Sequence, residues 1–189
     1  PGRGRQGNLL KLTGRVLIVS PDPQSLRTAS RRLSGARFTW TYIGSSVIEY
    51  DLAGAELDGP GSFLDSFDRF HQISEELREP YLELIYELGV KAGSLDWWAT
   101  PLSYRSAYIS HSYRAVCYLT TAFDLARSHQ EPEPLVLVCG KDFQDALSNN
   151  LKQAGVEAEF VGTRTQPNFN FLTSILNMLA HRAKYLSTE

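Results

Sequence analysis

Apolar residues along this chain follow two alternating patterns, one typical of strands and one typical of helices. Residues 15–20 and 134–139 are nearly continuous apolar runs, which predict strands buried on both faces of a parallel sheet. Residues 38–43 alternate aromatic residues with threonine, and residues 158–161 form a shorter run, so each predicts a further strand. We therefore expect a sheet of about four to five strands.

Between these runs the apolar residues recur at intervals of three and four, which predicts helices. One helix is expected at residues 24–33 and three more at residues 63–77, 80–88 and 104–127, with Pro80 opening the second of the three. Two later helices are predicted from the apolar stripes Phe143, Ala146, Leu147 and Leu151, and Phe171, Leu172, Ile175, Leu176 and Leu179.

Residues 45–62 lack a clear period and contain Gly54, Gly59, Pro60 and Gly61. Glycine and proline interrupt regular structure, so this stretch is expected to be mainly a loop. Residues 47–52 could alternatively form a short strand.

The alternation of strands and helices predicts an α/β fold, with a Rossmann-like parallel sheet flanked by helices and a helical segment in the middle of the chain. Residues 1–14 are rich in Gly and Arg and are expected to be a flexible lead-in or the remnant of a tag. Residues 15–189 are expected to form a single domain. Because the chain begins with Pro1, we expect a piece of a longer, two-domain protein.

Composition argues against some classes of function but does not identify the function. A formal net charge of −2 gives no general reason to expect a nucleic-acid partner. Cys117 and Cys139 are too few for a disulfide framework and lie in apolar runs, so both are expected to be buried thiols. No apolar run is long enough to span a membrane, which predicts a cytoplasmic protein and leaves peripheral attachment to a membrane open.

The densest candidate chemistry lies at residues 95–114, which read LDWWATPLSYRSAYISHSYR. Indole rings can pack on the face of a sugar or base, while a guanidinium binds anionic oxygens. Trp97 and Trp98 are therefore candidate ligand-binding residues. Equally, the two rings could anchor the start of a buried helix.

Residues on the predicted helix extend this candidate site. Ser103, Ser106, Ser110 and Arg114 are spaced three or four apart, so they share one face that could line a cleft or pack closely against another helix. His111 is the candidate for proton transfer, against the alternative of an ordinary hydrogen-bonding histidine.

Strand ends provide a second set of candidates, because ligands of α/β sheets collect beyond the carboxyl ends of the strands. Ser20 follows the first predicted strand and Lys141 follows the run at 134–139, where each could contact a phosphate or carboxylate. The alternative for Ser20, Asp22 and Asp142 is simple helix capping. Neither a phosphate-binding glycine motif, a metal-ligand spacing nor an activated nucleophile is recognisable in the sequence.

The segment LDWWATPLSYRSAYIS, leading into a long helix, resembles bacterial surface carbohydrate biosynthesis proteins with a glycosyltransferase-B-like organisation. The resemblance covers residues 15–161 and its specific part is the Trp-Trp element followed by a polar patch. It implies that Trp97, Trp98, Arg105 and Ser106 are site residues, together with neighbouring Tyr104. The family often carries an acidic–basic pair where this chain has Tyr104 and Arg105, so no catalytic acid is carried over.

That resemblance implies the acceptor-side half of a glycosyltransferase, which transfers a sugar from an activated donor to a surface polysaccharide. Its partners would be a glycan acceptor and a second α/β domain of the same protein. A nucleotide-sugar donor would be the substrate of the full-length protein, with no further cofactor, and this half alone is expected to be inactive.

Two other function classes stay open. RVLIVSPDPQSLRTASRRL is similar to the first strand and helix of response-regulator receiver domains, although the acidic cluster such domains need is reduced to Asp22. The chain could also be a stand-alone module that binds a sugar or a nucleotide.

Overall fold

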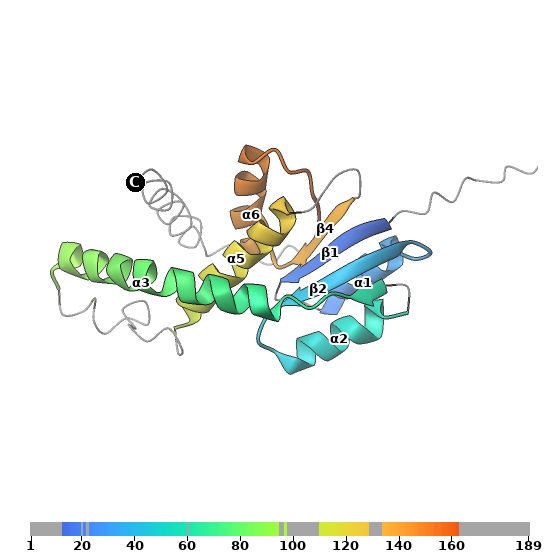
Figure 1. Cartoon of the computed structure of the whole chain (residues 1–189), viewed down its shortest axis with the longest axis horizontal. Helices are drawn as coiled ribbons and strands as arrows, with labels where there is room; N and C mark the ends of the chain where they lie inside the picture. Colours follow the sequence, from blue (N-terminus) through green and yellow to red (C-terminus); the bar gives the residue numbers. More distant parts are fainter. Residues whose placement is uncertain are drawn as a thin grey trace, which may run out of the picture.

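A five-stranded parallel sheet forms the centre of the computed structural model, which describes residues 13–19, 21, 23–59, 61–94, 97, 110–128 and 134–162 (Figure 1). The strand order is β3-β2-β1-β4-β5. The strands are β1 (Thr13–Val19), β2 (Arg37–Ile43), β3 (Gly61–Phe63), β4 (Leu135–Cys139) and β5 (Glu159–Val161). The predicted Rossmann-like α/β fold is thereby confirmed.

The two continuous apolar runs lie side by side in the middle of this sheet. Val16 of β1 is the register partner of Val136 in β4, and Val19 is the partner of Cys139. Every residue of β4 is buried, as are residues 16–19 of β1. Burial on both faces explains why these strands lack the polar alternation of β2.

Helices cover both faces of the sheet, as in a doubly wound fold. On one face α1 (Pro23–Arg32) and α2 (Val47–Leu57) pack on the core of Val16, Ile18, Trp40 and Val138. On the other face α5 (His111–Arg127) and α6 (Lys141–Gln153) enclose a core that includes Leu17, Leu119, Leu137 and Leu147.

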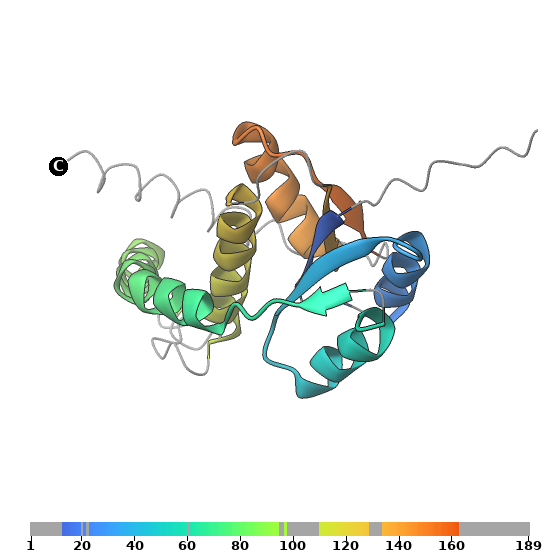
Figure 2. The same ribbon diagram turned by 45° about the vertical axis from the view of Figure 1, so that its right-hand side comes forward.

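A helical hairpin extends from the sheet. Helix α3 (Phe67–Ala92) runs alongside α5, and both views show the pair reaching beyond the sheet (Figures 1 and 2). Tyr81 and Ile85 of α3 pack against Tyr113 and Cys117 of α5. Since Arg15 at the start of β1 donates to the carbonyl of Leu125 near the end of α5, the first turns of α5 lie toward the carboxyl ends of the strands.

The prediction for residues 45–62 is wrong: they hold helix α2 and the short edge strand β3, not a loop or a strand at 47–52. Apolar residues lie on several sides of α2, so the sequence shows no helical period there. The missed signal is Ser46-x-x-Glu49, because the Ser46 side chain accepts from the Glu49 N–H and begins the helix.

The two helices predicted at 63–77 and 80–88 are one continuous helix, α3, with Pro80 inside it. Proline removes one backbone hydrogen bond, but Tyr81, Leu84 and Ile85 are buried directly after it and hold the helix together. Phe63 lies in β3 and not on this helix.

Several predicted elements fall on residues outside the described part. These are the lead-in at 1–12, residues 104–109 of the helix predicted at 104–127, and the last helix over 171–179. Among the described residues, no helix has both the length and the apolar content that crossing a bilayer requires.

Candidate functional site

The carboxyl edge of the sheet contains the point at which the strand order reverses. From β1 the chain proceeds to β2 and β3 on one side, and β4 and β5 then lie on the other side. The connections that leave β1 and β4 therefore enter α1 and α6 on opposite faces, and in doubly wound folds ligands bind between two such strand ends. Pro21 and Gly140 lie at this reversal point, directly beyond Val19 and Cys139.

Helix α6 begins at this edge without a capping side chain. Gly140 is its N-cap in an extended conformation, and an added Cβ there would meet no atom within 4 Å. Lys141 stands in the first turn, where its ammonium lies 2.8 Å from both carboxylate oxygens of Asp145. A ligand carboxylate or phosphate at this edge would meet the N-terminus of α6 and would compete with Asp145 for Lys141.

Helix α5 carries the predicted histidine in its first turn. His111, Ala115, Tyr118 and Ala122 follow one another at helical spacing, so they form one stripe of the helix. Tyr118 and Ala122 pack into the core above the sheet, while His111 is exposed. His111 stands about 10 Å farther along α5 than Tyr118, in the direction of the carboxyl ends of the strands.

His111 and Arg114 are brought together. The Arg114 Nη2 lies 3.1 Å from the His111 Nδ1, and because a guanidinium only donates, Nδ1 accepts. The imidazole is thereby held as the tautomer with a proton on Nε2, which can donate to a hydroxyl or an anionic oxygen. This pair is the best-defined polar feature on the first turn of α5, which we call the α5 overhang.

Ser110 does not lie on the helix face that its spacing from Arg114 predicts. It is fully buried, its Oγ lies 2.9 Å from the Tyr81 hydroxyl, and it accepts from the Tyr113 N–H at 3.1 Å. It caps α5 and links the helix to α3, so it does not line a ligand face with Arg114 in this structure. Burial raises the pKa of Tyr81, so that hydroxyl stays protonated near neutral pH.

The remaining predicted residues are divided between the hairpin and the undescribed part. Trp97 is half-buried beyond Gly93, which ends α3 at a φ of 59°, and its backbone N–H points to Ser94 Oγ at 3.4 Å. Residues predicted for the site that lie outside the described ranges are Ser20, Trp98, Tyr104, Arg105 and Ser106. The side chain of Asp142 and all of Asp22 are likewise outside them.

A polar cluster at the end of β2 was missed. The Tyr42 hydroxyl accepts from the Ser46 N–H at 3.1 Å and lies 2.9 Å from Glu49 Oε2, to which it donates. Burial, followed by this bond to Glu49, raises the pKa of Tyr42 above its ordinary value. Gly44 is required beneath the ring, because a Cβ there would lie 2.2 Å from the hydroxyl. The cluster fixes the loop that borders the carboxyl edge.

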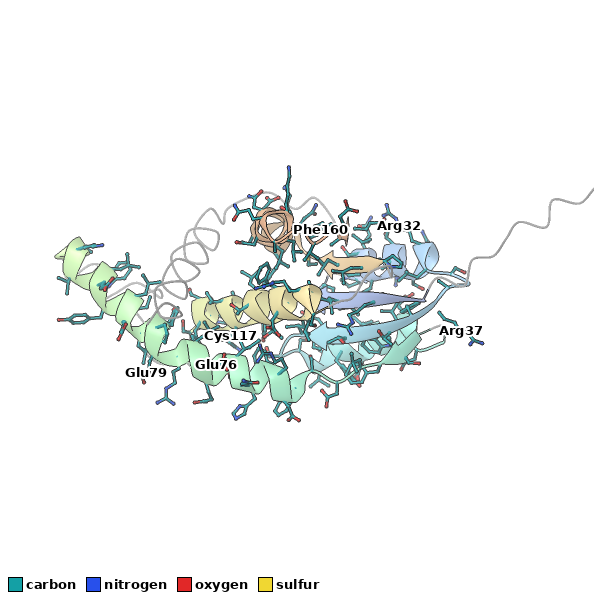
Figure 3. The ribbon with its side chains drawn as sticks, turned by 45° about the horizontal axis from the view of Figure 1, so that its top comes forward. Arg32, Arg37, Glu76, Glu79, Cys117 and Phe160 are labelled. Atoms are coloured by element: carbon teal, nitrogen blue, oxygen red, sulfur yellow. The ribbon has the colours of Figure 1, made fainter. Side chains whose placement is uncertain are left out.

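Cys117 and Cys139 are free and buried, as predicted. Figure 3 labels Cys117 on α5, where it packs among α3 residues. Burial raises the pKa of Cys117 to about 11 and that of Cys139 to about 12, so neither is a thiolate at neutral pH. Within the described ranges, no three His, Cys, Asp or Glu side chains are grouped so that they could hold a metal ion.

An open cleft of about 650 Å³ lies at the opposite end of the sheet, where β4 and β5 begin. Its lining includes Pro134, Ser148, Lys152, Gly155 and Phe160. It contains none of the predicted site residues, although its lining includes Lys152, Glu157 and Glu159, the last of which is ion-paired with Arg32. The chemistry therefore favours the carboxyl edge, although the cleft gives the alternative location that an experiment must distinguish.

Comparison of the chain with protein-family models, with curated proteins and with solved structures finds no match.

Proposed function

We propose that this chain is the acceptor-side half of a glycosyltransferase that acts in bacterial surface polysaccharide synthesis. In this role it binds a glycan beside the carboxyl edge of the sheet, while a second α/β domain of the same protein holds the activated sugar donor. The observation that carries the proposal is the pair of His111 and Arg114 in the first turn of α5, a helix whose first turns lie toward the carboxyl ends of the strands.

The chemistry of sugar transfer suits these groups. A glycan offers many hydroxyls and few charges, so it is bound by neutral donors, guanidinium groups and flat aromatic rings. The Nε2–H of His111 supplies a neutral donor, and Arg114 supplies further N–H groups beside it. Trp97 lies beyond the last turn of α3, at the end of that helix away from the sheet (Figure 1), so a stacking role for Trp97 and Trp98 requires a glycan that extends along the hairpin.

The donor phosphates would lie nearer the sheet. The uncapped start of α6 and the ammonium of Lys141 provide positive potential where β4 ends. A leaving nucleoside diphosphate develops negative charge during transfer, and positioned donors stabilise it. Lys141 is therefore assigned to the phosphate side of the reaction and His111 to the acceptor side.

Sheet topology bears on the receiver-like alternative. Receiver domains have the order 2-1-3-4-5, in which the third strand adjoins the first. Here β3 lies at the edge beyond β2, and β4 adjoins β1. The end of the third strand, which carries the phospho-accepting position of a receiver, thus lies at the sheet edge and not beside β1, which argues against the receiver-like alternative.

Titration of tryptophan fluorescence tests the proposal. Oligosaccharides and nucleotide-sugars are added separately to the wild type and to Trp98→Ala, Arg105→Ala and Arg114→Ala. We expect saturable quenching by oligosaccharide that weakens at least tenfold in each variant. Lys152→Ala, a change in the lining of the cleft at the opposite end of the sheet, is the control for that alternative location and should titrate like the wild type.

Two results would count against the proposal. A saturable response that is identical in the wild type and all three site variants would remove the assigned site. Quenching by nucleotide-sugar alone, with no response to any oligosaccharide, would favour a stand-alone nucleotide-binding module.

A further inference from the structure

Helix α2 has apolar residues on several of its sides, with Glu49, Asp51 and Glu56 between them, yet only part of it is buried. Ala53 and Leu57 face the core beside the sheet. Val47 is 72% exposed and Ile48 is 73% exposed, and Tyr50 and Leu52 are also exposed. A helix with apolar residues on several sides is normally covered on those sides.

At Tyr50 the exposed surface of α2 meets the end of β3, and exposed apolar residues follow at the start of α3. The rings of Tyr50 and Phe63 lie 5.5 Å apart, and Phe63 also contacts Trp40 at 4.8 Å. Leu64 and Phe67 follow, the latter 69% exposed. Figure 2 shows α2 and β3 next to each other at this side of the sheet. We call this surface the α2–β3 patch: Val47, Ile48, Tyr50, Leu52, Phe63, Leu64 and Phe67.

The size of the patch matches a binding surface. With aromatic side chains of about 150–250 Å² and the exposed fractions above, the patch presents on the order of 600 Å² of apolar surface. Ordinary monomers rarely exceed that value, and one side of a standard protein interface covers about 800 Å².

Among the described residues, the unpaired charges along the patch are acidic, since Arg27 is paired with Glu56 and Arg69 with Asp124. Between Arg37 and Arg69 the sequence has no Lys or Arg and six acidic residues. Three of these, Asp51, Asp65 and Asp68, are exposed and stand directly beside patch residues. Two copies joined across a twofold axis would bring acidic rims together, whereas a cationic partner would be attracted.

We propose that the α2–β3 patch binds a basic amphipathic helix of a partner protein. The apolar stripe of that helix covers Ile48, Leu52 and Phe67, and its flanking Lys or Arg side chains approach Asp51 and Asp68. This mode buries the remaining side of α2 and pairs opposite charges at the rim. The patch is separate from the α5 overhang, so the assignment stands independently of the glycan site.

Fluorescence anisotropy tests this assignment with a labelled 18-residue peptide of Leu and Lys in helical amphipathic order. A second peptide has Glu in place of every Lys. We expect the basic peptide to bind the whole chain and the acidic peptide to bind at least tenfold more weakly. Ile48→Ser combined with Phe67→Ser should weaken basic-peptide binding at least tenfold, whereas Val90→Ser, an equally exposed site on α3, should not.

Reversing the charges beside the α2–β3 patch makes the test specific. In the Asp51→Lys, Asp68→Lys variant, the acidic peptide should become the tighter ligand. Equal affinity of both peptides, no binding of the basic peptide, or a charge preference that the rim reversal leaves unchanged would each overturn the assignment. A dimer in sedimentation that Ile48→Ser with Phe67→Ser dissociates would also overturn it, in favour of a second copy.

Discussion

The Tyr81 hydroxyl and the Ser110 Oγ lie 2.9 Å apart in the buried contact between α3 and α5. This hydrogen bond sets the start of α5 against the middle of α3, since Ser110 also caps the helix through the Tyr113 N–H. The position of His111, the next residue, therefore depends on a contact made by a helix far away in the sequence. Ser110 therefore positions His111 and does not itself face the carboxyl edge of the sheet.

Replacement of Ser110 by alanine should destabilise the fold. It removes the cap of α5 and leaves the buried Tyr81 hydroxyl without this partner, so we expect a loss of about 2 kcal/mol. Urea denaturation measures this loss. Tyr81→Phe removes the same bond but keeps the cap, and it should cost less. A Ser110→Ala variant of unchanged stability would contradict the structural role.

The ion pair between Arg69 and Asp124 should stabilise the hairpin measurably. Its two contacts, at 2.7 and 2.6 Å, form a bidentate pair between α3 and α5. Since both side chains are partly exposed, we expect Arg69→Ala to cost about 1 kcal/mol, less in molar salt. Arg78, whose contacts at 3.7 and 3.8 Å stay within α3, is the control and should cost less. Equal costs in urea denaturation would contradict this account.

Stability should fall in alkali because of the two buried thiols. Burial raises the pKa of Cys117 to about 11 and that of Cys139 to about 12, from an ordinary value of 9.0. The folded state keeps these protons when the unfolded state has lost them, so the stabilisation is complete below pH 9 and is lost as pH rises toward 11 and 12.

The slope should reach about 1.4 kcal/mol per pH unit for each thiol, as measured by denaturation at a series of pH values. Cys139→Ala should flatten the curve above pH 9. An identical slope in that variant would show that Cys139 does not contribute to the loss.

Arg114 should fix the tautomer of His111. Because Arg114 donates to Nδ1, the imidazole in the wild type should carry its proton on Nε2, and Arg114→Ala should release a mixture of both tautomers. Long-range nitrogen–proton NMR of the histidine side chain distinguishes the two forms. A mixture in the wild type would show that the pair does not form in solution.

Much of the fold follows from local pattern, and the exceptions have physical causes. The runs at residues 15–20 and 134–139 identify β1 and β4, because strands buried on both faces need no polar residues. Helix α2 was missed because apolar residues lie on several of its sides. A helical period can be recognised in a sequence only where one side of the helix is polar and the other apolar. Pro80 indicated a helix start because a proline inside a helix loses a backbone hydrogen bond, and this cost is visible in the local sequence. The packing against α5 that offsets the cost is not visible there.

The candidate site was predictable only in part. Placing Lys141 at a strand end required only the order of elements, and His111 was identified as the histidine beside the aromatic and serine run. The spacing of Ser110 from Arg114 did not show that Ser110 is buried, because that depends on Tyr81 of a distant helix. The Tyr42 cluster was missed because Glu49 meets Tyr42 only once α2 has formed.

The most direct measurement for the whole account is backbone amide NMR of the isotope-labelled chain during titration with an oligosaccharide and then with a nucleotide-sugar. The account predicts that the largest shift changes cluster at Gly140, His111 and Gly44, around the carboxyl edge, and that Arg114→Ala reduces them. Changes concentrated instead at residues 151–160, which line the cleft at the amino ends of β4 and β5, would contradict it.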